Sequence, residues 1–307
     1  MRAAARRTVG RREARMNATD STDVFVDHRN LLFTVAYEML GSAADAEDVL
    51  QETWLRWVEV DREEVREARA YLVRIATRLA LNRMRTNARR RESYVGPWLP
   101  EPLLTTPDVA EDVELADSVS LAMLTLLETL GPTERAVFVL REVFDFGYDE
   151  IAAAVDKTPA AVRQIAHRAR GHVAERRPRA EATRSEREHV MATFLAAVAT
   201  GDIQSLMDVL APDVVLVTDG GGVKKAALRP ILGRDKVVRF LGAVSEGLDA
   251  VADVVVVNGA PALRIVLDGE LDTVASMVVE DGLVTGLYVV RNPAKLARLD
   301  AVVTLTR

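Results

Sequence analysis

Arginines at helical spacing are the first side chains in the sequence with an evident chemical use. A helix drawn through residues 70–91 gathers on one polar side Arg74, Arg78, Asn82, Arg85 and Arg89. The side next to it is apolar, and no acidic residue occurs between Arg69 and Arg91. A solvated surface helix is the alternative, but such a surface usually mixes charges of both signs. A row of cations without acids favours contact with a polyanion such as a nucleic-acid backbone.

A second basic surface is predicted from a helix-turn-helix pattern over residues 148–170. The first helix should end near Val155, and Thr158 and Pro159 should cap and begin the second helix. The polar side of this second helix is formed by Arg163, Gln164, His167, Arg168 and Arg170. Such side chains reach base edges and phosphates from the major groove of DNA. An ordinary helical hairpin with a polar face is the alternative.

Catalytic chemistry has little support in the sequence. The chain has no cysteine, which excludes disulfides, thiol catalysis and cysteine-based metal sites, and which suits a reducing cytoplasm. From His189 onward there is no second histidine, and neither a nucleophile–base pair nor a pair of carboxylates is evident. We therefore expect no enzyme activity, no cofactor and no metal ion.

Three folded units are needed to position these side chains. A disordered basic tail is predicted over residues 1–22, an all-helical unit over 23–93 and a linker over 94–118. A second helical unit should cover residues 119–180, and an α+β unit residues 186–300. Three prolines and a glycine between Tyr94 and Pro102 prevent the linker from forming a helix.

The last unit is predicted to open with two helices and to continue as an antiparallel sheet. Its β-branched runs are separated by Gly and Asp turns, which is typical of strands joined by hairpins. The runs occupy Asp213–Thr218, Asp253–Asn258, Ala262–Leu267 and Leu283–Val290.

The average charge of the chain conceals a strong asymmetry. The 307 residues carry a formal net charge of −6, which taken alone argues against binding nucleic acid. Residues 1–16 nevertheless contain six Arg and one Glu, and residues 158–190 contain eight Arg and four Glu, whereas residues 101–117 contain six acids and no base. This distribution favours a polyanionic partner. No apolar run approaches the roughly 18 residues of a membrane span, so no membrane partner is expected.

The segment Asp45–Trp57, with the sequence DAEDVLQETWLRW, resembles the polymerase-binding helix of bacterial sigma-70-type factors. The basic helix after it is similar to their reader of the −10 promoter element, and residues 126–177 to the region that reads the −35 element. Two sigma domains without others are typical of the extracytoplasmic-function group. The linker Tyr94–Pro102 and the α+β unit resemble one subgroup, which carries a C-terminal SnoaL-like domain of the nuclear-transport-factor-2-like class.

The resemblance implies roles for individual residues on the two sigma domains. Core RNA polymerase would be bound by an acidic face made of Asp45, Asp48, Gln51, Glu52 and Leu55. Melted −10 DNA would lie near Asn82, Arg83 and Arg85, within a basic stripe made of Arg74, Arg78, Asn82, Arg83, Arg85 and Arg89. Many relatives carry Asp at position 82, so Asn82 departs from the pattern. The −35 element would be contacted by Thr158, Arg163, Gln164, His167, Arg168 and Arg170.

The resemblance also assigns the linker and parts of the C-terminal domain. The linker residues Tyr94, Pro97, Trp98, Leu99 and Pro100 would pass through the polymerase cleft, although Trp98 could instead pack on a neighbouring domain. Regulation is implied for two motifs, which comprise Asp219, Gly220, Gly221, Gly222 and Lys224, and Asn292, Pro293, Lys295 and Leu296. Val223 stands where the subgroup tends to carry lysine. The final segment would support activity, while the rest of the domain restrains it and replaces a separate anti-sigma protein.

The sequence thus predicts a cytoplasmic transcription initiation factor whose partners are core RNA polymerase and promoter DNA. An unknown small molecule or protein is a further candidate partner of the C-terminal domain. One alternative is a one-component regulator that binds an operator without polymerase and senses a small molecule. A second alternative, an enzyme with a DNA-binding appendage, lacks the acid–base residues it would need.

Overall fold

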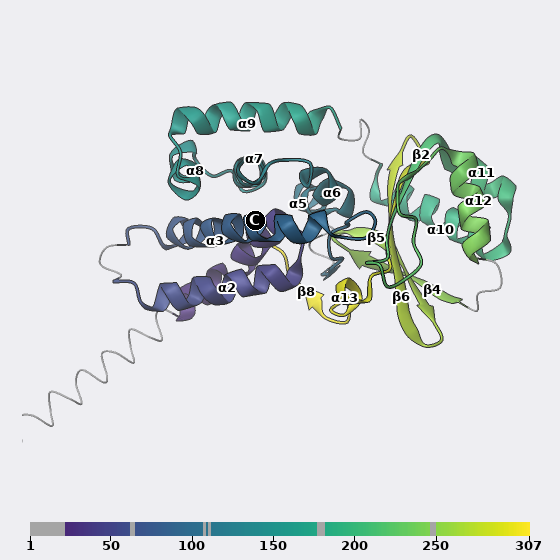
Figure 1. Ribbon diagram of the computed structural model, residues 1–307, viewed down its shortest axis with the longest axis horizontal. Coiled ribbons are helices and arrows are strands. Elements are labelled where there is room, and N and C mark those ends of the chain that lie inside the picture. The colour runs from purple at the N-terminus through teal and green to yellow at the C-terminus, as the bar shows by residue number, and fades with distance from the viewer. Residues whose placement is uncertain (1–21, 62–64, 107–108, 110–111, 177–181, 246–249) are drawn as a thin grey trace, which may run out of the picture. The chain divides into compact units, whose positions relative to one another are not determined.

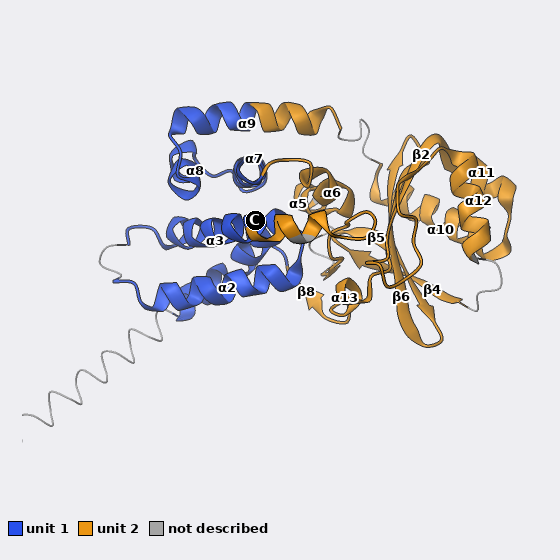
Figure 2. Cartoon of the chain, in the orientation of Figure 1, with its two compact units in different colours: residues 1–85, 132–167, 305–307 blue, residues 86–131, 168–304 orange. Residues whose placement is uncertain are grey.

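A computed structural model describes residues 22–61, 65–106, 109, 112–176, 182–245 and 250–307. The predicted basic tail lies outside these residues, except for its last position. The chain forms two compact units, shown in different colours in Figure 2. The first comprises residues 1–85, 132–167 and 305–307, and the second residues 86–131 and 168–304.

The first unit is helical. A helix over residues 22–40 ends at Gly41, whose φ of 65° suits a residue without a side chain. Ser42 then caps the next helix by accepting a hydrogen bond from the Asp45 amide at 3.2 Å. The helices that follow are α2 (Ala43–Val58), α3 (Ala68–Glu92), α7 (Pro132–Phe138), η2 (Val139–Val143), α8 (Tyr148–Val155) and α9 (Pro159–Ala174). Both α3 and α9 continue into residues of the second unit.

The second unit contains an α+β domain built on one eight-stranded sheet (Figure 1). Its helices are α5 (Val113–Val119), α6 (Leu121–Leu127), α10 (Arg184–Thr200), α11 (Ile203–Val209), α12 (Arg234–Ser245) and α13 (Pro293–Leu296). Its strands are β1 (Leu104–Thr105), β2 (Leu210–Asp219), β3 (Ile231–Leu232), β4 (Ala250–Val257), β5 (Ala260–Leu267), β6 (Glu270–Glu280), β7 (Leu283–Val290) and β8 (Val302–Val303). The strand order is β3-β2-β7-β6-β5-β4-β1-β8.

The prediction of a purely antiparallel sheet is wrong. Strands β4 to β7 do form an antiparallel meander, but β2 pairs with β7 in parallel, with Leu216 opposite Leu287. The two strands lie far apart in the chain, so no hairpin constrains their direction. The sequence reading also missed β6 and the short strand β1. The linker supplies β1, which pairs with β4 and, in parallel, with β8.

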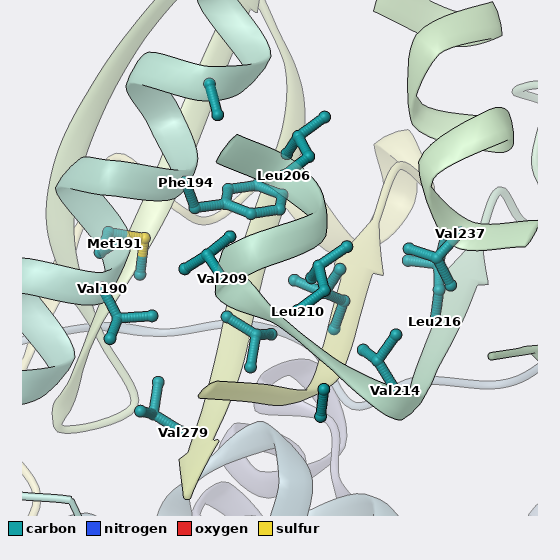
Figure 3. Close-up of a cluster of buried hydrophobic side chains, with 14 of the residues drawn as sticks. Val190, Met191, Phe194, Leu206, Val209, Leu210, Val214, Leu216, Val237 and Val279 are labelled. Atoms are coloured by element: carbon teal, nitrogen blue, oxygen red, sulfur yellow. The ribbon is translucent and has the colours of Figure 1, made fainter. Parts of the chain in front are cut away.

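Two apolar clusters hold the domain together on the two faces of its sheet. Helices α10, α11 and α12 cover one face, and Figure 3 shows part of their shared core with the sheet, where Phe194 lies near Leu206 and Val209. The other cluster joins linker residue Leu99 and Leu121 of α6 to Val257, Val290 and further sheet residues. Leu99 and Leu121 are almost fully buried. The linker is therefore part of the core of this unit.

Candidate functional site

The acidic face of α2 lies on the solvent side of its helix, as predicted. Asp48, Gln51, Glu52 and Leu55 are exposed, and Asp45 is half-buried. Leu55, the last residue of this face, is a large apolar side chain that is 61% exposed. The opposite side of α2 packs into the core through Ala46, Val49, Leu50, Thr53 and Trp57. Trp54 is half-buried, with its ring 5.1 Å from that of Phe25.

The basic stripe of α3 is present, but its side chains have different partners. Arg83 turns toward α2 and forms ion pairs with Asp45 at 2.8 Å and Asp48 at 2.6 Å. Arg78 donates a hydrogen bond to the Ala153 carbonyl oxygen of α8 at 2.8 Å. The remaining positions differ in exposure, because Arg74 is half-buried while Asn82, Arg85 and Arg89 are exposed.

The partners of Arg83 and Arg78 change the predicted stripe. Arg83 links the −10 candidate residues to the acidic face, so two surfaces expected to bind different partners share an ion pair. The Arg78 guanidinium is engaged with a carbonyl of the first helix of the helix-turn-helix. Arg85 donates to Asn82 at 3.2 Å and stays on the exposed side.

The helix-turn-helix forms at the predicted residues. Helix α8 ends at Val155, and Asp156 adopts a left-handed conformation with a φ of 55°. The Thr158 hydroxyl oxygen accepts a hydrogen bond from the Ala161 amide at 3.2 Å, which caps α9 where Pro159 begins it. Val162, Ala166 and Ala169 are buried on the inner side. The exposed side consists of Arg163, Gln164, His167, Arg168 and Arg170, here called the recognition face.

A buried arginine ties α7 to the first helix of the same unit. The Arg135 side chain of α7 is fully buried and donates from Nε to the Glu38 carbonyl oxygen at 2.8 Å. Burial lowers the pKa of the guanidinium to about 9, although the nearby Glu38 carboxylate opposes this change. The sequence reading missed this residue, because nothing in the pattern of α7 distinguishes a buried arginine from a surface one.

The linker is held by a cluster of buried polar groups in the C-terminal domain. We call Asp219, Asn292 and Lys295 the linker seat. The Asp219 carboxylate accepts hydrogen bonds from the Tyr94 hydroxyl at 2.6 Å and from the Leu99 amide at 2.9 Å. Asp219 is fully buried, so these bonds form away from water and hold the linker at two points.

The other two residues of the linker seat complete the contact. The Lys295 ammonium pairs with Asp219 at 2.7 Å, donates to the Leu99 carbonyl oxygen and lies 3.2 Å from the centre of the Trp98 ring. Asn292 donates from Nδ2 to the Tyr94 hydroxyl oxygen at 2.7 Å. Burial lowers the pKa of Lys295 to about 8, against the attraction of Asp219, and burial with the Asp219 hydrogen bond raises the pKa of Tyr94. Trp98 thus packs on the C-terminal domain.

The glycines of residues 220–222 let the chain pass close to the linker seat. A Cβ atom on Gly220 would lie 2.2 Å from the Lys224 carbonyl oxygen, and one on Gly221 would lie 2.4 Å from Asn292 Nδ2. Gly221 and Gly222 also have positive φ angles, of 61° and 72°. At Gly222 the nearest side chain is that of linker residue Val95. Glycine is therefore required for space at position 220, for conformation at position 222, and for both at position 221.

Two further interactions were missed by the sequence reading. Asn258 is buried, accepts from the Leu103 amide at 2.9 Å and donates to the Val119 carbonyl oxygen at 2.8 Å, so it fixes both ends of the acidic stretch of the linker. The Asn-Gly dipeptide at 258–259 was the available signal, since it favours a tight turn. Buried Asp272 pairs with Lys224 at 2.9 Å and with Arg291 at 2.8 Å. The predicted Lys224 therefore faces Asp272 and not the linker.

The remaining predicted motif residues support this site. Pro293 begins α13 directly after Asn292, whose Oδ1 accepts from the Ala294 amide at 3.0 Å. Leu296 is buried in the cluster that contains Leu99. Pro97 is half-buried and Pro100 is buried. Among the described helices, none is long and apolar enough to cross a lipid bilayer.

Two regions of the chain match models of known protein families. Residues 24–90 match Sigma-70 region 2, and residues 120–173 match Sigma-70, region 4. The ECF RNA polymerase sigma factor SigJ of Mycobacterium tuberculosis is 36% identical over 283 residues, which cover 87% of this chain and 90% of that protein. A second protein of that species, named "Probable ECF RNA polymerase sigma factor SigI", is 31% identical over 89% of this chain and 94% of its own length.

The solved structures agree with these sequence matches. The crystal structure of the Mycobacterium tuberculosis extracytoplasmic function sigma factor SigJ matches with a TM-score of 0.73 and 32% identity. The match covers 90% of this chain and 98% of that structure, so it includes the α+β domain as well as the helical regions. The chain therefore belongs to the extracytoplasmic-function group of sigma-70-type RNA polymerase sigma factors, in the form that carries a C-terminal SnoaL-like domain.

Proposed function

We propose that this sigma factor binds core RNA polymerase through the acidic face of α2 and recognises a two-part promoter through α3 and α9. The recognition face carries the proposal furthest, because five polar side chains, three of them arginines, are exposed on a helix whose other side is buried. That division is what a helix needs to read base edges in a major groove. The exposed Asn82, Arg85 and Arg89 of α3 would lie near the −10 element.

The acidic face complements these basic surfaces. Its exposed acids and Gln51 suit a basic partner, and the exposed Leu55 offers an apolar contact beside them. Core polymerase and promoter DNA are therefore the partners we assign, within the cytoplasm. We assign no enzyme activity to the C-terminal domain.

The C-terminal domain would regulate initiation through the linker. The linker seat holds Tyr94, Trp98 and Leu99, which are the residues expected to enter the polymerase cleft. The same side chains cannot be buried in the domain and lie free in the cleft, so polymerase has to displace the domain from them. A restraint within the chain would remove the need for a separate anti-sigma protein.

Run-off transcription with purified core polymerase tests this assignment. The full chain is compared with versions that end just before Ser185 and just before Asn292, and with the point variant Lys295→Ala and its exposed control Lys236→Ala. Absence of a core-dependent transcript from every version would refute promoter-specific initiation by this chain. Restraint through the linker seat predicts more transcript from Lys295→Ala and from the version that ends before Ser185 than from the full chain or the control.

The version that ends before Asn292 separates two modes of regulation. If the final segment supports activity, as the family resemblance implies, this version makes less transcript than the full chain. More transcript than from the full chain would instead mean that the final segment contributes only to the restraint. Equal activity of all versions would remove regulation by the domain altogether.

A further inference from the structure

The C-terminal domain encloses a second site that the sigma activity does not use. A cavity of about 330 Å³ lies between α10, α12 and the sheet. Its walls are mostly aliphatic and aromatic, and include Phe194, Val198, Leu263, Phe240 and Leu287. Small-molecule sites in proteins have this character, with a few polar groups at defined positions in an otherwise apolar cavity.

The polar groups of the cavity gather at one end. Strand pairing and hydrogen bonds bring together the polar lining residues, which are Thr218, Lys225, Asp272, Thr273 and Arg291. The other described residues of the lining are apolar. Arg291 donates to Asp272 from Nε at 3.0 Å and from Nη2 at 2.8 Å, and also to the Lys225 carbonyl oxygen at 2.8 Å. The guanidinium is thereby fixed in orientation before any ligand arrives.

The charge at this end is unbalanced. Among the described residues that line the cavity, Asp272 is the one carboxylate, and it already pairs with both Lys224 and Arg291. Burial raises the pKa of Asp272, but the hydrogen bonds from Lys224, Thr273 and Arg291 outweigh this and lower it, so the carboxylate is ionised. One negative charge therefore pairs with two cations, and Lys225, an exposed residue of the lining, adds a third cation that forms no ion pair among the described residues. An anion at this end would find surplus positive charge.

We propose that this cavity binds an amphiphilic monoanion, a small carboxylic acid with an apolar body. The apolar part would lie between α10, α12 and the strands, and the carboxylate would face Lys225 and Arg291. A neutral or cationic molecule of the same shape would leave the positive charge of Lys225 and Arg291 without a negative partner.

Calorimetric titration of the full chain with sodium decanoate tests the proposal, with decylammonium chloride as the probe of opposite charge. We expect saturable one-to-one binding of decanoate, at least about tenfold tighter than binding of decylammonium. Equal affinity for the two probes, or no saturable heat with decanoate, would overturn the assignment.

Two pairs of variants locate the site. Ala252 lies on β4 and lines the cavity, whereas its neighbour Val251 is 69% exposed and does not. Ala252→Phe should abolish decanoate binding, and Val251→Phe, which adds a ring of the same size on the other face of the strand, should leave it unchanged. Circular dichroism and thermal unfolding show whether both variants are folded.

The second pair of variants removes the charge of a lysine and leaves the apolar core of the domain unchanged. Lys225→Gln should weaken decanoate binding by about fivefold and should not weaken the binding of decylammonium. Lys236→Gln, at an exposed lysine of α12 outside the cavity, should change neither. Unchanged decanoate affinity in Lys225→Gln together with retained binding in a folded Ala252→Phe would place the probe elsewhere and refute the site.

Discussion

The recognition face and the linker seat both use charged side chains, but in opposite environments. On α9 the arginines are exposed and the helix is held by an apolar inner side. In the linker seat Asp219 and Lys295 are buried, and they bind groups of their own chain. An exposed charge is available to an external partner and adds little to stability, whereas a buried pair is costly to break. The charged side chains of the recognition face are thus available to an outside partner, whereas those of the linker seat hold the fold together.

Breaking the linker seat should have the largest effect. Asp219→Ala removes the counter-ion of Lys295 and the acceptor for Tyr94 and Leu99, so it should lower the free energy of unfolding of this unit by about 3–5 kcal/mol. Urea unfolding followed by tryptophan fluorescence measures the loss. Hydrogen exchange at the Leu99 amide should accelerate as well.

The control for this change is Asp208→Ala, at an exposed carboxylate that accepts from Gln204 at 2.8 Å. This variant should change stability by less than about 0.5 kcal/mol. A similar loss in the two variants would mean that burial of Asp219 has no special consequence and would break the comparison.

On the recognition face the same kind of truncation should affect DNA and not stability. Arg168→Ala should weaken binding of the holoenzyme to the −35 element by about 1–3 kcal/mol if Arg168 makes a bidentate base contact, and should leave unfolding unchanged. Competition binding with mutated −35 sequences measures the loss. A uniform loss across all sequences would indicate a phosphate contact, and Arg187→Ala, on α10, serves as the control outside this face.

Leu55 tests whether an exposed apolar side chain is reserved for a partner. Leu55→Ala should weaken core polymerase binding by about 1–2 kcal/mol without destabilising the free protein, because the side chain is 61% exposed there. Fluorescence anisotropy with labelled sigma factor gives the affinity. Ile203→Ala is the matched control, at a side chain that is 64% exposed on α11. Equal effects of the two substitutions would remove Leu55 from the interface.

Tyr94→Phe is the mildest change to the linker seat. It keeps the ring against Trp98, whose centre lies 4.7 Å away, and removes only the hydroxyl that links Asp219 and Asn292. The expected loss is about 1 kcal/mol in the free energy of unfolding. Urea unfolding next to that of Asp219→Ala shows whether the hydroxyl carries a small part of the seat, as expected, or most of it.

Local patterns in the sequence were sufficient to predict the exposed surface of the helix-turn-helix. The cap at Thr158, the start of α9 at Pro159 and the exposed side of that helix all follow from residues within a few positions of one another. The Asp219 contacts could not be predicted in this way, since Tyr94 and Lys295 lie 125 and 76 residues away in sequence. The family resemblance predicts a regulatory role for the motif around Asp219, but nothing in the spacing of the motif identifies the residues that Asp219 contacts.

The parallel pairing of β2 with β7 could not be predicted for the same reason. A strand's own residues indicate that it is extended and which face is buried, but the choice of neighbour depends on the whole sheet. Arg83 gives a similar lesson at shorter range, since its ion pairs with Asp45 and Asp48 depend on how α2 and α3 pack. Helical spacing placed it correctly on its own helix and could not show which way the guanidinium turns.

The ends of β2 and β7 belong to two sites at once. Thr218 lines the cavity and Asp219 holds the linker, and Arg291 lines the cavity next to Asn292 of the linker seat. Thermodynamic linkage makes any coupling between such sites reciprocal. A compound that binds the cavity more tightly when the linker is released must favour that release by the same factor, and polymerase that draws the linker away must raise the affinity for the compound equally. Transcription initiation and occupancy of the cavity would then both depend on the equilibrium between the bound and the released linker.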